Sequence, residues 1–272
     1  MRAGLMCLGA VFALTACGGG GDSGSSPASS QPSSSGSGSS TGAGAPTLSQ
    51  FVTYQTVDAA DEGNSTIQFK SPTVAGDTLW VVVTVSDFAG THSITLSDTQ
   101  GNEFIALDQE NDGAPATQSL AHFYAANIAG DASTPDTITV HWGSDNYKGI
   151  MAADISGASH TPLIAHTANT QDGLAKGTAN VTSTGMSVPT NDVPALLVAL
   201  SMNASGGTSD TGGSGAAGAT ASTGFTQVAQ FWNWGANLGT LSTKVVSTAG
   251  DVSANFDAPD TDSYVTVAAV FK

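Results

Sequence analysis

Residues 77–86 read DTLWVVVTVS, and this stretch decides the fold. An apolar run of strand length, rich in β-branched residues and closed by polar ones, is typical of a buried β-strand. Residues 192–201 read DVPALLVALS, which repeats the order of an acid, an apolar run and a closing serine 115 positions later. The sequence therefore predicts two equivalent buried strands and an internal duplication.

Two further matches keep the same order along the chain. Residues 152–155 fall on residues 268–271 at a shift of 116, and residues 129–131 resemble residues 249–251 at a shift of 120. A period this long does not suit a solenoid. It suits two diverged halves of one sandwich, or two similar small domains.

The other strand signals are spread over both halves. Apolar runs separated by Gly, Asn and Asp clusters mark the clearest strands, which are residues 78–85, 93–97, 120–126, 137–142, 149–155, 195–202, 238–247 and 264–271. No segment requires a helix. The sequence therefore predicts an all-β, antiparallel, jelly-roll-like β-sandwich over residues 46–272. We favour one sandwich with halves at 48–160 and 161–272, because no second linker separates them.

Side-chain alternation assigns faces in two of these strands. The residues expected to share one buried face are Val265, Val267, Ala269 and Phe271 and, at the equivalent earlier position, Met151, Ala153 and Ile155. Asp154 then lies on the opposite face of an apolar strand. A solvent-facing or hydrogen-bonded carboxylate is commoner there than a catalytic one.

Composition argues against several function classes. The chain has a formal net charge of −16 at pH 7, with 22 Asp and Glu against 6 Lys and Arg. Phosphates and anionic lipids are bound through Lys and Arg, so this balance argues against nucleic acid and against a basic membrane patch. Both cysteines lie within the first 17 residues. We therefore expect neither a disulfide nor a cysteine metal site in the folded part.

The N-terminus carries the pattern of an export signal. Arg2 precedes an apolar run over residues 5–14, which is too short to cross a membrane core that takes about 20 helical residues. Residues 14–17, LTAC, resemble the lipobox of bacterial lipoproteins. The resemblance implies that residues 1–16 are removed and that Cys17 is lipidated. Ordinary secretory cleavage at the same place is the alternative.

The lipid would determine where the mature protein resides. Several acyl chains, palmitate among them, make a stable membrane anchor, whereas a single chain is marginal. Gly18 follows Cys17 in place of the Asp that retains enterobacterial lipoproteins at the inner membrane. The resemblance therefore favours the outer membrane of the cell envelope, on its periplasmic or surface side. Residues 17–45 are rich in Gly and Ser, and they predict a disordered tether with a root-mean-square span of roughly 30 Å.

Three short motifs lie in the folded part: Gly-Asn-Glu-Phe at 101–104, Phe-Tyr at 123–124 and Ala-Asp-Ile-Ser-Gly at 153–157. In this order they resemble β-sandwich modules of exported bacterial proteins, which are mainly uncharacterised or adhesion-like. The resemblance implies a sandwich that binds or adheres. The motifs themselves carry no chemistry.

The folded part lacks the sequence motifs of two large hydrolase classes. It contains neither Gly-x-Ser-x-Gly nor HExxH. His122 and His141 fall in predicted strands, where a hydrogen-bonded or surface histidine is favoured over a metal ligand. His160 and His166 are expected in a loop, close enough to share a transition metal, although an ordinary loop is favoured.

Acidic clusters offer oxygen ligands for calcium. Asp108, Glu110 and Asp112 lie in the segment DQEND, which does not match the EF-hand spacing. A structural calcium ion there is one interpretation, and a solvated acidic loop is the favoured alternative. No other cofactor is expected. Pairs of carboxylates suited to glycosidase chemistry arise by chance in so acidic a chain.

One aromatic segment offers a surface for sugars. In residues 231–235, FWNWG, alternation puts Trp232 and Trp234 on one side of the chain. Two indoles beside the Asn233 amide can stack on sugar rings and bind their hydroxyls. The favoured alternative is that both pack in the core, as expected for Trp80 and Trp142.

The sequence favours a non-catalytic, membrane-anchored binding or adhesion module, with polysaccharide as a candidate ligand. Its expected partners are the membrane, through lipid on Cys17, and a glycan or an envelope protein. An exported hydrolase that uses carboxylates such as Asp154 or Asp108 is one alternative. An envelope structural or assembly subunit that binds protein is another.

Overall fold

The computed structural model describes residues 44–55, 63–86, 93–111, 118–142, 148–174, 180–183, 185–203, 219–233, 237–258 and 262–272. All of them belong to one unit of the chain, Thr41–Lys272. This part is built from β-strands, with one short 3-10 turn at Thr190–Asp192. Within these ranges no helix is long and apolar enough to cross a membrane.

Two five-stranded antiparallel sheets form the centre of the unit. Main sheet I has the order β1 (Thr47–Gln55), β8 (Lys148–Ser156), β3 (Thr78–Ser86), β6 (Gln118–Ala125) and β5 (Ile105–Asn111). Main sheet II has the order β14 (Thr226–Asn233), β15 (Asn237–Val246), β12 (Ala195–Asn203), β18 (Asp262–Phe271) and β9 (Leu163–Leu174).

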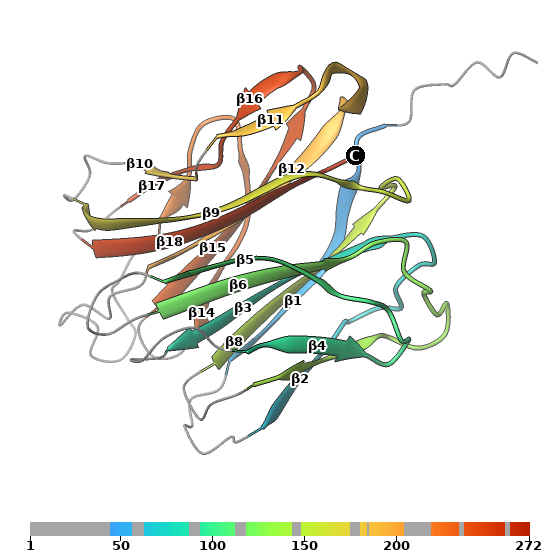
Figure 1. Cartoon of the computed structure of the whole chain (residues 1–272). Coiled ribbons are helices and arrows are strands. Elements are labelled where there is room, and N and C mark those ends of the chain that lie inside the picture. The colour runs from blue at the N-terminus through green and yellow to red at the C-terminus, as the bar shows by residue number, and fades with distance from the viewer. Residues whose placement is uncertain are drawn as a thin grey trace, which may run out of the picture. The chain divides into compact units, whose positions relative to one another are not determined.

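Smaller sheets cover the outer face of each main sheet. Outer sheet I consists of β2 (Asn64–Gln68), β7 (Thr137–His141) and β4 (Thr95–Asp98). The second outer layer is split into β10 (Asn180–Thr182), β17 (Asn255–Asp257) and β13 (Thr220–Ala221), and the pair β11 (Met186–Val188) and β16 (Gly250–Val252). Figure 1 shows β2 and β4 beyond main sheet I, and β11 and β16 beyond main sheet II.

Three apolar cores hold these layers together. One lies between outer sheet I and main sheet I and includes Phe69 and Ile138. The central core includes Trp80 and Leu200 and joins the two main sheets. The third includes Phe256 and lies under the second outer layer. The predicted all-β sandwich is thus confirmed, and each half of the chain has its own outer layer.

The two halves repeat one strand order. The order β1-β8-β3-β6-β5 of main sheet I corresponds, strand by strand, to the order β9-β18-β12-β15-β14 of main sheet II. The Val82–Met151 pair of β3 and β8 corresponds to the Leu200–Val267 pair of β12 and β18, and all four side chains face the central core. The predicted shift of 116 between β8 and β18 agrees with this register.

The predicted shift of 115 between β3 and β12 was wrong, because the ladder pairs give 118. The predicted shift is three residues too small, and an odd error in register exchanges the two faces of a strand. It would match Val82, in the central core, with Leu197, which faces the second outer layer. The acid and serine that flank the two runs are therefore not equivalent positions.

All eight strands expected from the sequence are present. The predicted faces of β8 and β18 are confirmed in the central core, and Trp80 and Trp142 are buried as expected. The edge strands β1, β5, β9 and β14 were not predicted, because their mixed polar sequences lack a continuous apolar run. For the same reason, the loop expected around His166 was wrong, since His166 lies in β9.

Candidate functional site

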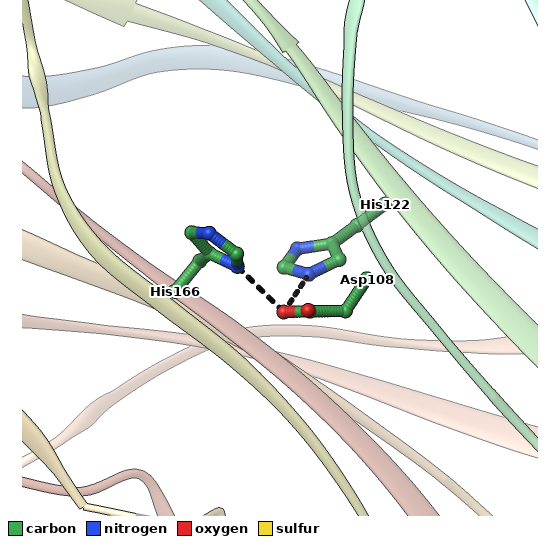
Figure 2. A group of neighbouring side chains, drawn as sticks. All are labelled: Asp108, His122 and His166. Carbon is green, nitrogen blue, oxygen red and sulfur yellow. Dashed lines mark hydrogen bonds and ion pairs between the residues drawn. The ribbon is translucent and has the colours of Figure 1, made fainter.

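A cluster of three ionisable side chains lies where β5 of main sheet I meets β9 of main sheet II. Figure 2 shows Asp108 between His122 and His166, with one carboxylate oxygen directed at both rings. Asp108 Oδ2 is 3.2 Å from His122 Nε2 and 2.6 Å from His166 Nδ1. The cluster therefore links β5 and β6 of the first half to β9 of the second.

A bulge in β5 places Asp108 for these contacts. The ladder between β5 and β6 shifts between Ala106 and Gln109, so Leu107 and Asp108 both lie opposite His122. A bulge of this kind bends the strand and redirects a side chain. The acidic loop expected at Asp108 and Glu110 was wrong, because both residues lie in β5.

The three groups differ in exposure and in protonation. The His122 side chain is wholly buried, whereas those of Asp108 and His166 are 33% and 36% exposed. The hydrogen bond from His122, reinforced by His166, lowers the pKa of Asp108 to about 2, so Asp108 is a carboxylate. Burial lowers the pKa of His122 and keeps that ring neutral.

Trp80 determines which nitrogen of His122 carries the proton. The indole Nε1–H donates to His122 Nδ1 at 3.3 Å. Indole nitrogen is only a donor, so Nδ1 is the acceptor and the neutral ring carries its proton on Nε2. That proton is donated to Asp108. The cluster is thus a hydrogen-bonded chain from Trp80 through His122 to Asp108, with His166 as the second donor.

This protonation pattern bears directly on metal binding. The three donor atoms lie within 4.8 Å of one another, and two imidazoles with one carboxylate suit a transition metal better than calcium. A metal-bound histidine normally donates its other N–H to an acceptor. His122 does the reverse, because its second nitrogen accepts from Trp80. The arrangement therefore fits a proton network better than a three-ligand metal site.

The repeat shows that the fold itself does not require these polar groups. We call the residue at the matching ladder position of the other half the counterpart. The counterparts of Trp80, Asp108, His122 and His166 are Val198, Ala229, Leu241 and Phe51. All four are apolar and belong to the edge between β1 and β14 or to the central core. The cluster is therefore a specific feature of the β5–β9 edge.

The other residues expected to bind metal lie apart from the cluster. Glu110 accepts a hydrogen bond from Thr170 Oγ1 at 3.4 Å, a second polar link between β5 and β9. Asp112 lies outside the described residues, so calcium at Asp108, Glu110 and Asp112 stays a prediction. His160 is exposed in the connection between β8 and β9 and does not belong to the cluster.

A second candidate site covers the outer face of outer sheet I. Alternation in β2, β7 and β4 turns one set of side chains inward and the other outward. The outward set, which we call the polar face, contains no Asp, Glu, Lys or Arg and consists of Asn64, Thr66, Gln68, Thr95, Ser97, Thr137, Thr139 and His141. Asn64, His141 and Thr95 form one row across the sheet, and Thr66, Thr139 and Ser97 form the next.

Hydrogen bonds of His141 join two neighbouring rows of the polar face. His141 Nδ1 lies 2.8 Å from Asn64 Oδ1, and His141 Nε2 lies 3.0 Å from Ser97 Oγ. The amide oxygen is an acceptor, so Nδ1 carries the proton and Nε2 accepts from the serine hydroxyl. A hydroxyl, an imidazole and an orienting group also occur in acyl-transfer enzymes, but those sites add donors for an oxyanion. Here the three side chains lie on an open sheet face.

The predicted aromatic platform falls partly outside the described residues. Trp232 and Asn233 end β14, opposite Leu238 and Asn237 of β15. Their side chains and the whole of Trp234 are outside the described part, as is Cys17, so these predictions stand as made.

The comparisons with known proteins gave no match. No protein-family model, no curated protein and no solved structure resembles the chain closely enough to be matched to it. A functional proposal therefore rests on the residues of this chain.

Proposed function

We propose that the protein is a lipid-anchored, extracytoplasmic binding module and that the polar face binds an uncharged polysaccharide. One observation carries this proposal: one sheet face presents eight polar side chains that can form hydrogen bonds, with no Asp, Glu, Lys or Arg among them, in a chain of net charge −16. Neighbouring outward side chains are about 6.7 Å apart along a strand and about 4.8 Å apart across strands. That array offers regularly spaced partners to a polymer rich in hydroxyl groups.

The composition of the polar face favours a glycan over other polymers. A protein interface normally has an apolar centre with aromatic anchors, and this face has Thr139 at its centre instead. Nucleic acid requires cationic side chains. Thr, Ser and Asn side chains donate to and accept from sugar hydroxyls, and threonine methyl groups contact the sugar ring.

The non-catalytic part of the proposal rests on the chemistry of the two candidate sites. In the cluster, Asp108 Oδ2 accepts hydrogen bonds from both histidines, and His122 Nδ1 accepts one from Trp80. On the polar face, Ser97 and His141 lie on an open surface. Neither arrangement surrounds a position where a reacting atom would be held between a nucleophile and oxyanion donors.

The anchor part rests on the lipobox resemblance of residues 14–17. Lipid on Cys17 would hold the sandwich at the cell envelope, by preference at the outer membrane. In Figure 1, β2 and β4 lie on the side of the unit away from the end of β18. The polar face and the C-terminal end of the chain are therefore on different sides of the described unit.

The test is binding of the mature protein to immobilised neutral polysaccharides, with Cys17→Ser to remove the lipid. Thr66→Ala with Thr139→Ala deletes two neighbouring hydroxyls of the polar face. At about 1 kcal/mol for each lost hydrogen bond, affinity should fall by about tenfold or more. Ser187→Ala on β11, also exposed, is the matched control and should bind like the wild type.

Other outcomes identify the alternatives. Loss of binding in Trp232→Ala with Trp234→Ala, and not in the threonine variant, would place the glycan on the aromatic segment. Stable capture of an envelope protein without any glycan would support an assembly subunit. Release of reducing ends or of acid from the polymer would support the hydrolase and contradict a non-catalytic module.

A further inference from the structure

Two buried carboxyl groups face each other at one end of main sheet I, far in sequence from the acidic segment around Asp108. Asp77 precedes β3 and Asp154 lies in β8, where it pairs with Leu79. Asp77 is 6% exposed and Asp154 is 2% exposed. Both lie at the wall of a cavity of about 280 Å³, with Ser71 and Ser156 among its other lining residues.

The hydrogen bonds of Asp154 are incomplete. Gln50 Nε2 donates to Asp154 Oδ2 at 3.2 Å and to the Ser71 carbonyl at 3.0 Å, while the Ser71 N–H donates to Gln50 Oε1 at 3.1 Å. Asp154 Oδ1 is buried and receives no hydrogen bond from an N–H or hydroxyl group of the described residues. The amide of Gln50 is held in place, so it cannot turn to supply a second bond.

The neighbouring group is the carboxyl of Asp77. Two carboxyl groups form a hydrogen bond to each other only when one of them carries a proton. Burial, with the nearby Asp77 carboxyl, raises the pKa of Asp154 to about 6, and burial also raises the pKa of Asp77. When both groups have lost their protons, two buried negative charges need a positive partner between them.

The second half again shows that the fold does not require these charges. The counterparts of Asp154, Asp77 and Gln50 are Val270, Ala195 and Ala165. Val270 and Ala195 are buried in the third core. An apolar version of this end of the sheet therefore exists in the same molecule.

We propose that Asp77 and Asp154 bind a divalent cation with a preference for oxygen ligands, calcium first, at the wall of this cavity. Two carboxylates neutralise the charge of the ion and supply up to four oxygen ligands. The cavity leaves room for water and for the hydroxyls of Ser71 and Ser156 to supply others. The site is independent of the polar face, so neither proposal depends on the other.

The test is calorimetric titration of the full-length mature protein with CaCl₂ at pH 7.5, with MgCl₂ and MnCl₂ as further probes. The wild type should bind one calcium ion per chain at this site. Its Tm should rise by roughly 5 °C at a calcium concentration 100 times the Kd. Asp154→Asn keeps the shape of the side chain but removes its charge, and it should lose this binding and the rise in Tm.

Two variants make the result decisive. Asp257→Asn removes an exposed acid of β17 and should bind calcium like the wild type. If Asp154→Asn does not fold, Asp154→Val replaces it, because its counterpart Val270 is accepted at the same ladder position. If the wild type binds none of the three ions, Asp77 and Asp154 share only a proton, and the proposal is overturned. Equal calcium binding by the wild type and the Asp154 variant overturns it too.

Discussion

His122 is the buried titratable residue through which acid should act on the Asp108 cluster. Burial lowers its pKa below the ordinary value of 6.5. As pH falls below 6.5, the unfolded chain takes up a proton at this position before the folded protein does. The contribution of His122 to stability is therefore full above pH 6.5 and is lost toward its folded pKa, by at most about 1.4 kcal/mol for each pH unit.

His122→Leu gives this position the residue type of its counterpart, Leu241. The variant should lose the pH dependence of stability that His122 causes. Free energies of unfolding from urea titrations at pH 7.5, 6.5 and 5.5 would show the difference between wild type and variant moving in favour of the leucine as pH falls. His160→Leu, in the exposed connection after β8, is the control for replacing a histidine with leucine outside the cluster. A constant difference for His122→Leu would mean that this ring titrates alike in both states.

Asp154 acts in the opposite direction over part of the same range. Its pKa is raised from 3.8 to about 6, so the folded protein holds the proton more tightly than the unfolded chain. Its stabilising contribution is present below pH 3.8 and is lost as pH rises toward 6. Asp154→Val should therefore gain stability relative to the wild type between pH 4 and pH 7 in metal-free buffer, as measured by urea unfolding.

At the scale of elements, the Asp77 end of main sheet I depends on close contact between two segments, the turn at residues 74–77 and the segment with Ile128 and Gly130. Gly130 has a φ of +63°, and a Cβ there would lie 2.1 Å from the backbone nitrogen of Ala75. A hydrogen bond joins the same two segments: the Gly76 N–H donates to the Ile128 carbonyl at 2.9 Å. No side-chain rotation relieves a clash with backbone, so the two segments must move apart.

Gly130→Ala should therefore lower the free energy of unfolding by at least about 2 kcal/mol. Gly157→Ala is the matched control, because its φ of +74° is similar but nothing lies within 4 Å of its Cβ. It should cost about 1 kcal/mol, the strain of the left-handed conformation alone. Equal losses in the two variants would show that the segment around Ala75 yields without cost.

The elements also show what sequence patterns can and cannot predict. Strands such as β3 and β12 are apolar on both faces, because each main sheet is covered on both sides. Such strands are continuous apolar runs, and the sequence alone was enough to predict them. Edge strands such as β5 and β9 carry mixed residues, so Asp108 and His166 were assigned to loops. Asp108 was named from the sequence as a candidate calcium ligand, whereas its contacts with His122 and His166 depend on a bulge and on packing between the halves.

Only part of the polar face could be predicted from the sequence. The stretch 137–141 alternates polar and apolar residues, which indicates a half-buried strand. Its neighbours in the sheet, 64–68 and 95–98, come from distant parts of the sequence. Which strands share a sheet is set by long-range packing, and so the face as a whole could not be predicted.

At the scale of the whole molecule, the central core makes the two halves one folding unit. Leu200 of β12 is fully buried among residues of both main sheets. Leu200→Ala should cost about 2–5 kcal/mol, because it removes buried methyl groups and leaves a cavity between the sheets. Calorimetry should show one unfolding transition at a lower Tm.

Phe256→Ala provides the comparison, since Phe256 lies only in the core under the second outer layer. It should also lower the Tm of a single transition, because the second half of the chain, residues 161–272, cannot unfold without exposing the central core. Two separate transitions in either variant would contradict this coupling. They would describe two small domains that merely touch.

If lipid on Cys17 anchors the protein, as we propose, the first strand is also the place where mechanical load reaches the domain. β1 is an edge strand joined to β8 over the ladder from Thr47 to Gln55. A force applied to the chain before Gly44 and directed along β1 loads the hydrogen bonds of this ladder in shear. The bonds then bear the force together, and no single bond breaks first. An anchored module that grips a polymer would then resist detachment by flow most strongly along this axis and least when pulled sideways.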